Sequence, residues 1–224
     1  MKAVCLLSGG MDSSTLAYVA RDMGHSIIAL HLRYGQPTED AEFDCAQKIA
    51  AALDAEEFFT VDMDYLRRIG GSSLTDDALT IGDHKGGEGG IPNTYVPFRN
   101  SNLIAIATSL AEARGAEAIF IGVQASDYAG YPDCRPQFIE AFQRVIDTGT
   151  ADETQIRLMA PFVNMSKTEI LKQGFALGVP YEDTWSCYRS GAPACGTCDS
   201  CHYRLAAFRE VGREDLIPYE DRND

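Results

Sequence analysis

Apolar runs and helical patterns alternate along the first sixty residues of the chain. The segment Lys2–Leu7 (KAVCLL) is short and largely apolar, and apolar residues recur at helical spacing from Ser13 to Met23. This order predicts a strand, a glycine turn and a helix. The alternation continues with a predicted strand at residues 25–32, a helix at 41–53 and a strand at 57–61. Such a β-α-β-α-β order favours a parallel sheet with crossover helices.

The alternation is interrupted between residues 70 and 97 and then resumes. The interruption holds five glycines between Gly82 and Gly90, which predicts a long surface excursion of the kind that often forms a binding loop. Ser166 and Glu169 have the spacing of a capping box, and the helix that they begin is predicted to end at Gly178. The remaining predicted elements are helices at 101–114, 136–147 and 200–211 and strands at 118–123 and 156–159.

The composition limits the number of domains and the kind of partner. With 224 residues, of which 45% are hydrophobic and 23% charged, the chain has the material for one large domain, alone or with a small appendage. The formal net charge is −14 at pH 7, which is the wrong sign for stable nucleic-acid binding through phosphates. A local basic pocket can still hold a small anionic ligand.

Membrane segments and disulfides are not expected either. No stretch approaches 18 consecutive apolar residues, and the apolar run before the first glycines is too short for a signal peptide, so the expected location is the cytoplasm. The chain has seven cysteines, an odd number, and four of them fall within fifteen residues. In a reducing compartment this clustering favours a metal site over disulfides.

A dense polar motif follows the first predicted strand. Residues 8–14 read Ser-Gly-Gly-Met-Asp-Ser-Ser, and a glycine turn between a strand and a helix presents backbone N–H groups to an anion. The serine hydroxyls can donate to phosphate, and Asp12 can hold Mg²⁺ or cap the helix. Capping requires only one such residue, so the whole motif favours a phosphate site. Neither a Walker A loop nor a G-x-G-x-x-G motif follows the strand.

This motif resembles the SGGxDS signature of the PP-loop ATP pyrophosphatases. The resemblance implies a Rossmann-like α/β fold of the PP-loop, or adenine nucleotide alpha hydrolase-like, type. It also implies transfer of AMP from ATP to an oxygen of the substrate, with Mg²⁺ as a second cofactor. The ATP-binding residues that it implies are Leu7, Ser8, Gly9, Gly10, Met11, Asp12, Ser13 and Ser14. The signature alone does not separate members that form amides from those that modify tRNA or transfer sulfur.

Four cysteines near the C-terminus have the spacing of a metal site. Cys187, Cys195, Cys198 and Cys201 form a C-x7-C-x2-C-x2-C pattern, and four thiolates suit a tetrahedral Zn²⁺. The alternatives are an iron–sulfur cluster and unligated buried thiols. A four-thiolate zinc site has no open position, so its role is expected to be structural. We therefore expect a PP-loop ATP-binding and substrate domain at residues 1–180 and a small zinc-binding lobe at 181–224.

A second polar run has the character of a substrate rim. Residues 127–135 read Asp-Tyr-Ala-Gly-Tyr-Pro-Asp-Cys-Arg. The carboxylates can accept from the N–H edge of a guanine-like base, the tyrosines can stack on its ring, and the arginine can bind a carboxylate. The alternative is a solvated loop with Gly130 and Pro132 as turn residues. The density of aromatic and charged residues favours binding.

Three segments in sequence order resemble the 7-cyano-7-deazaguanine synthase family, namely Pro92–Asn100, the run at 127–135 and Cys187–Cys201. The resemblance implies ATP-dependent conversion of 7-carboxy-7-deazaguanine and ammonia to 7-cyano-7-deazaguanine, through adenylated carboxylate and amide intermediates, in queuosine or archaeosine biosynthesis. It also implies a homodimer. The catalytic residues that it implies are Asp12, Arg99 and Lys167. The implied substrate contacts are Tyr34, Gln36, Arg99, Asp127, Tyr128, Tyr131, Asp133 and Arg135.

The sequence departs from this family at two places. Pro37-Thr38 stands where Arg-His is common, and Phe98 stands where a glycine is usual. One alternative is therefore a specialised relative that transfers the deazaguanine acyl group to another amine, such as a protein amine. Another is a different PP-loop amidotransferase or tRNA-modifying ligase, and a third is a zinc-stabilised binding module without enzymatic activity. The net charge of −14 disfavours the readings that involve nucleic acid.

Overall fold

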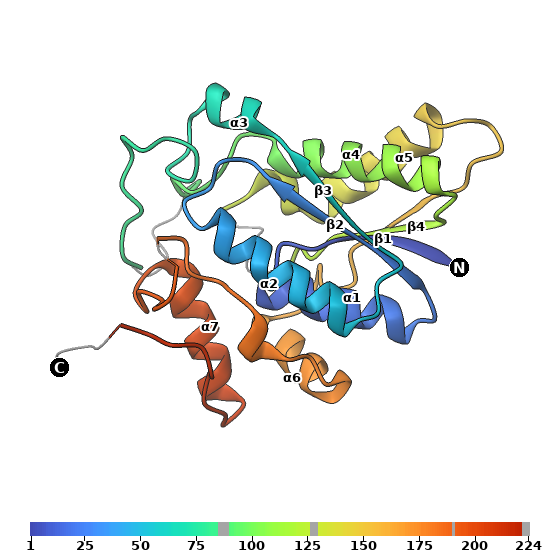
Figure 1. Cartoon of the computed structure of the whole chain (residues 1–224). Coiled ribbons are helices and arrows are strands. Elements are labelled where there is room, and N and C mark those ends of the chain that lie inside the picture. The colour runs from blue at the N-terminus through green and yellow to red at the C-terminus, as the bar shows by residue number, and fades with distance from the viewer. Residues whose placement is uncertain (85–89, 126–129, 190, 221–224) are drawn as a thin grey trace.

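A five-stranded parallel sheet forms the centre of the molecule, and helices surround it (Figure 1). The structure is a computed structural model that describes residues 1–84, 90–125, 130–189 and 191–220. The spatial order of the strands is β3-β2-β1-β4-β5, and every neighbouring pair is parallel. The strands are β1 (Lys2–Leu6), β2 (Ser26–Arg33), β3 (Glu57–Asp62), β4 (Ala118–Phe120) and β5 (Arg157–Met159). The predicted α/β fold with a parallel sheet is confirmed.

Helices cover both faces of the sheet (Figure 1). One face carries α1 (Met11–Asp22), α2 (Glu39–Ala52), α6 (Lys167–Leu177) and α7 (Asp199–Glu210), and the other carries α3 (Asp64–Ile69), α4 (Arg99–Arg114) and α5 (Pro136–Gly149). Alternate residues of β1 serve the two cores: Ala3 and Cys5 join the first, and Val4 and Leu6 join the second. A strand buried on both faces reads as a continuous apolar run, which is what KAVCLL is.

The predicted elements are confirmed apart from their ends and one omission. The capping box is present, with the Ser166 hydroxyl accepting from the Glu169 N–H, and Gly178 ends the helix. The strand predicted at 118–123 was too long: β4 ends at Phe120, because its neighbour β5 has only three residues with which to pair. Helix α3 has six residues, too few to produce a recognisable period. The described part of residues 70–97 contains no helix or strand.

The order of the strands creates a crevice at one end of the sheet. From β1 the chain proceeds outward through β2 and β3, whereas β4 and β5 lie on the other side of β1. The connections therefore diverge at the carboxyl ends of β1 and β4. Open parallel sheets bind ligands at such a topological switch point, and the polar motif at residues 8–14 begins two residues after β1 ends.

The C-terminal region packs against the main body of the protein. Ala207 and Phe208 of α7 join the core that α1 and α6 form. Arg204 is fully buried and forms two short hydrogen bonds with Asp215, at 2.6 and 2.9 Å, which fasten the following segment to α7. The boundary predicted at residue 180 stays a prediction. Across the described residues, no helix is both long and apolar enough to span a bilayer.

The buried histidine of β2 is expected to make stability depend on pH. His31 is fully buried, and its Nδ1 donates to the Leu7 carbonyl at 2.9 Å. Burial lowers its pKa, so the folded state holds a neutral ring. The stability that the neutral ring contributes is fully present above the ordinary histidine pKa of about 6.5. It is lost as the pH falls toward the lowered pKa of the folded state. We expect the free energy of unfolding in urea to decrease by about 1 kcal/mol from this source between pH 7.5 and pH 5.5.

The matched variant is His31→Asn, because an asparagine amide can donate to the same carbonyl but does not titrate. Its unfolding free energy should fall less over this pH interval than that of the unaltered protein. Equal decreases in the two proteins would show that His31 is not responsible.

Candidate active site

The polar motif after β1 forms a turn that is held by internal hydrogen bonds and lies at the crevice. Ser8 and Ser13 hold it together: their hydroxyl oxygens are 2.9 Å apart, the Ser8 N–H donates to Ser13 Oγ at 3.2 Å, and the Ser13 hydroxyl contacts the Gly10 carbonyl at 3.2 Å. Gly10 is the N-cap of α1 and supplies no side-chain cap. The first N–H groups of the helix thus remain available to an anion, as phosphate binding at a helix N-terminus requires.

A glycine is required at position 9 by the close approach of α2. Gly9 has a φ of +83°, and a Cβ there would lie 2.4 Å from the Glu42 carbonyl oxygen. Its carbonyl also accepts from the Trp185 N–H at 2.9 Å. The turn is therefore fixed between α2 on one side and the cysteine-rich segment on the other.

A partly buried ion pair joins this turn to α6. Lys167 Nζ lies 2.8 Å from Asp12 Oδ2, and both side chains are about one-fifth exposed or less. The Gln124 amide donates to the same carboxylate oxygen at 3.2 Å. Asp12 Oδ1 is buried and has no hydrogen-bond partner among the described residues. An unpartnered buried carboxylate oxygen is costly, and it fits a hard cation such as Mg²⁺, which prefers oxygen ligands.

Arg99 brings a positive charge to the other side of the crevice. It is the first residue of α4, and its guanidinium donates to the Tyr34 hydroxyl at 2.9 Å. Burial by itself would lower the pKa of Arg99. The pKa is nevertheless raised above its ordinary value by four neighbouring groups, the hydroxyls of Tyr34, Tyr188 and Tyr131 and the thiol of Cys134. A guanidinium at the positive end of a helix is suited to an anionic ligand.

The backbone conformation at Phe98 explains why a glycine is usual at this position of the related motif. Phe98, the N-cap of α4, has a φ of +57°, in the left-handed region. Glycine adopts this region without steric cost, whereas a phenylalanine is strained there. Phe98 is 62% exposed, so its ring does not enter the second core. The departure at this position changes the backbone strain next to Arg99.

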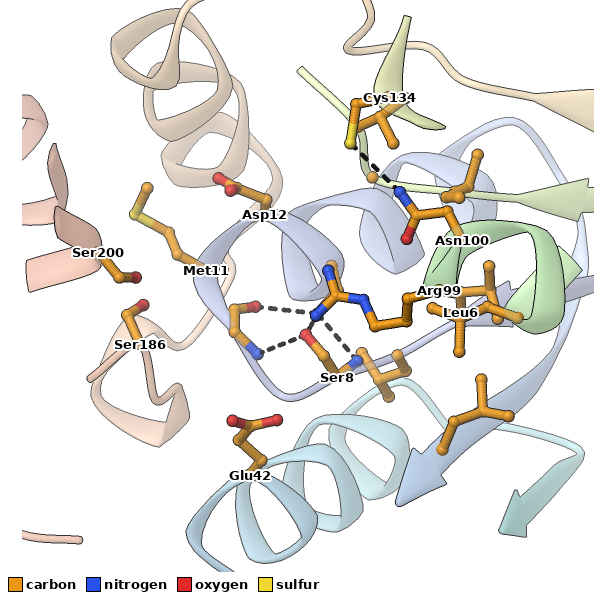
Figure 2. Close-up of a pocket in the computed structure, with 18 of the residues that line it drawn as sticks. Leu6, Ser8, Met11, Asp12, Glu42, Arg99, Asn100, Cys134, Ser186 and Ser200 are labelled. Atoms are coloured by element: carbon orange, nitrogen blue, oxygen red, sulfur yellow. Dashed lines mark hydrogen bonds between the residues drawn. The ribbon is translucent and has the colours of Figure 1, made fainter. Parts of the chain in front are cut away.

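The turn, the ion pair and Arg99 face one pocket at the switch point (Figure 2). The predicted site residues that line it are Leu7, Ser8, Gly10, Met11, Asp12, Ser13, Tyr34, Arg99, Tyr131 and Lys167. Thr94 also lines it and shares a 2.8 Å hydrogen bond with the Tyr131 hydroxyl. The structure thus brings together the polar turn at residues 8–14, two cations and three tyrosines from segments that are far apart in the sequence.

The other predicted site residues lie elsewhere or outside the described residues. Asp133 is 3% exposed, and its carboxylate accepts from the Asn100 N–H at 2.8 Å, so it fixes the start of α4. Arg135 is the N-cap of α5. Gln36 is buried behind the wall, where its amide donates to Glu42 at 3.0 Å. Gly9 and Ser14 belong to the motif at residues 8–14 but are buried and do not line the pocket. Asp127 and Tyr128 lie outside the described residues.

Sequence reasoning missed several residues of the pocket wall. Glu42 comes from α2, and Gln124 follows β4. Trp185, Ser186 and Ser200 come from the cysteine-rich region. None of them belongs to a dense motif. For two of them the sequence holds a signal, because Ser186 directly precedes Cys187 and Ser200 directly precedes Cys201.

The four C-terminal cysteines meet in a buried cluster. The Sγ atoms of Cys187, Cys195, Cys198 and Cys201 all lie within 4.8 Å of one another. Backbone N–H groups also donate to sulfur, from Arg189 to Cys187 at 3.4 Å and from Cys198 to Cys195 at 3.4 Å. Such N–H···S bonds stabilise thiolates, the form that binds metal. The cluster can therefore hold a metal ion.

The four thiols affect one another's protonation. The thiols of Cys198 and Cys201 donate to Cys187 and lower its pKa, and the same contact raises the pKa of Cys198 to about 11. Four thiolates this close together repel one another, so without a metal some of the thiols keep their protons. A metal bound here must displace those protons, so its affinity is expected to rise with pH.

Comparisons with known proteins agree with this geometry. A family model described as queuosine biosynthesis protein QueC matches residues 2–212. The 7-cyano-7-deazaguanine synthase of Methanoculleus marisnigri is 63% identical over 219 residues, covering 98% of this chain and 99% of its own. The synthase of Methanospirillum hungatei is 62% identical over 219 residues, covering 98% and 100%.

A solved structure of low identity shares the fold. The U34-tRNA thiolase NcsA from Methanococcus maripaludis, solved with its [4Fe-4S] cluster, is 15% identical, covers 94% of this chain and 66% of its own, and has a TM-score of 0.51. This likeness shows a shared fold and carries no information about the substrate.

Proposed function

This chain belongs to the QueC family of queuosine biosynthesis proteins, and we propose that it converts 7-carboxy-7-deazaguanine and ammonia into 7-cyano-7-deazaguanine at the expense of ATP. The observation that carries the proposal is the shared pocket, in which the phosphate-binding turn and the Arg99 wall face each other. The polar and cationic groups that line the pocket suit both the phosphates of a nucleotide and an anionic heterocycle. The relationship to curated synthases at 62–63% identity does not favour the alternative acceptors.

The chemistry requires two activations of the same carbon. A carboxylate is a poor electrophile, so its oxygen first attacks the α-phosphorus of ATP and pyrophosphate leaves. Ammonia then adds to the acyl carbon, a proton is lost, and AMP departs to give the amide. In the second round the amide oxygen takes AMP from another ATP, the nitrogen loses its remaining protons, and AMP departs as the nitrile forms.

The protein contributes position and charge to both rounds. The N–H groups of the turn and the Ser8 and Ser13 hydroxyls bind phosphate oxygens, and Lys167 neutralises charge as pyrophosphate departs. Arg99 holds the anionic acid with its carboxylate toward the nucleotide. We propose that Asp12, through its unpartnered Oδ1, holds Mg²⁺; bound there, the ion neutralises phosphate charge.

We propose Zn²⁺ as the metal of the four cysteines. Four thiolates around one tetrahedral ion with bonds of about 2.3 Å are about 3.8 Å from one another. The sulfur atoms of the chain, within 4.8 Å of one another, fit this arrangement. An iron–sulfur cluster distributes its cysteines over several irons and so needs wider spacing. The ion has no open position in such a site, and its role is to hold the pocket wall.

Free ammonia, a homodimer and a cytoplasmic location are further parts of this proposal. Free ammonia is the simplest source of nitrogen for the proposed reaction, and the homodimer rests on the family resemblance. A reducing cytoplasm suits a cluster of four reduced cysteines. The net charge of −14 favours a free heterocycle over tRNA as the substrate.

The test is a reconstitution with purified protein, ATP, Mg²⁺, 7-carboxy-7-deazaguanine and ¹⁵N-labelled ammonium. We expect mass spectrometry to find labelled amide and then labelled nitrile, together with AMP. A reaction without ammonium separates the acyl-transfer alternative, which predicts an increase in protein mass equal to the deazaguanine acyl group. If neither AMP nor labelled product forms, the proposed function is wrong.

A further inference from the structure

Glu42 is a carboxylate of the pocket wall for which the sequence analysis predicted no role. It lies on the first half of α2, directly below the glycine turn, and Figure 2 shows its side chain projecting from α2 toward Ser8. Among the described residues that line the pocket, Asp12 and Glu42 are the two carboxylates. Asp12 is committed to Lys167 and Gln124. Glu42 is therefore the carboxylate that a heterocyclic ligand can meet.

Two neighbours fix the orientation of the Glu42 carboxylate. Thr38 Oγ1 donates to Oε1 at 2.7 Å, and Gln36 Nε2 donates to Oε2 at 3.0 Å. Gln36 is itself held, because its Oε1 accepts from the Tyr34 N–H at 3.0 Å. Each carboxylate oxygen has two lone pairs, so each keeps one for a ligand. Thr38, one of the departures from the related family, thus has a defined contact here.

The pKa of Glu42 is raised above its ordinary value. Burial raises its pKa, while the hydrogen bonds from Thr38 and Gln36 and the charge of Arg99 oppose that rise. Arg99 gives its hydrogen bond to Tyr34. A ligand with N–H donors suits this carboxylate, because hydrogen bonds to it favour the ionised form.

The proposed reaction brings two heterocycles to the pocket, and their edges differ. The edge of adenine places an amino donor beside a ring nitrogen that accepts, and a carboxylate matches only the donor. The edge of a 7-deazaguanine places the N1–H donor beside the 2-amino donor. A carboxylate accepts only, with two oxygens that match two adjacent donors. The apolar wall of Leu6, Leu32 and Leu74 suits a planar ring.

The position of Asp133 strengthens this assignment. The sequence favoured Asp133 as a carboxylate for the base, but its side chain is turned into the start of α4 and is outside the pocket lining. We propose that Glu42 recognises the N1–H and 2-amino edge of 7-carboxy-7-deazaguanine and so determines which heterocycle is accepted. This inference rests on the proposed function, since it names the residue that reads that substrate.

The test is a change of substrate preference in Glu42→Gln. A glutamine presents one acceptor and one donor, which match the N1–H and the 2-oxo group of 7-carboxy-7-deazaxanthine. We expect the variant to lose about 10²-fold in kcat/KM for the natural acid, chiefly through KM, and to gain at least about 10-fold for the 2-oxo acid. The matched control is Glu39→Gln, one turn earlier on α2, where the carboxylate pairs with Arg33. It should keep the preference for the 2-amino acid.

Other outcomes would overturn the assignment. A fall in kcat for both acids at unchanged KM would make Glu42 a proton acceptor, and unchanged kinetics would remove it from the site. If Glu42→Gln fails to fold, the unaltered protein is assayed with the acid that lacks the 2-amino group. A KM within threefold of the natural value would then contradict the proposal. Failure of the unaltered protein to act on the natural acid would instead contradict the proposed function.

Discussion

Asp12→Asn is expected to lower kcat/KM for nitrile formation by about 10³-fold. The change removes the negative charge while keeping the shape of the side chain. It takes away the buried oxygen that has no partner, where we place Mg²⁺, and it leaves Lys167 without its counter-ion at 2.8 Å. Both groups stabilise the charge on pyrophosphate as it departs. The measurement is steady-state release of AMP with saturating ammonium, together with thermal unfolding of the variant.

The control for Asp12→Asn is Asp77→Asn. Asp77 also forms an ion pair at 2.7 Å, with Arg67, but both side chains are exposed. We expect its kinetics to stay within twofold of the unaltered protein. A double variant with Lys167→Gln should lose much less than the product of the two single losses, because the residues act as a unit. Full activity in Asp12→Asn would exclude Asp12 from the reaction.

The sheet and its helices were predictable because local signals agreed with the tertiary structure. The run KAVCLL forms a strand buried on both faces, and the Ser166 capping box begins α6 where expected. The glycine turn between β1 and α1 was also predictable, since its signal is contained in seven consecutive residues. Its binding of phosphate stays a prediction. The extent of β4 was not, because it depends on the length of β5, its neighbour in space.

The pocket wall was harder to predict because its residues come from separate elements. Asp133 belongs to a dense polar run, yet its carboxylate accepts from the Asn100 N–H in the first turn of α4. Glu42 stands in an ordinary helical sequence, and its place in the site depends on the approach of α2 to Gly9. A polar residue can serve the backbone or a ligand, and only the three-dimensional arrangement decides which. Spacing along the chain does not contain that information.

Cys198→Ser is expected to remove the metal and to disrupt the pocket. The unaltered protein should contain about one zinc per chain by elemental analysis, and the variant less than about a tenth of that. Loss of a structural ion removes folding free energy, and we expect thermal unfolding to begin at least about 10 °C lower. Iron together with acid-labile sulfide in place of zinc would instead support a cluster.

Activity should fall with the metal because the cysteine segment forms part of the wall. Trp185 holds Gly9 through its N–H, and Ser186 and Ser200 line the pocket next to two of the cysteines. The matched control is Cys45→Ser, a half-buried thiol outside the cluster, which should keep both zinc and turnover. Removing zinc from the unaltered protein with a chelator should reproduce the loss, and adding zinc back should restore it. A metal-free protein with full turnover would show that the wall holds its shape without the ion.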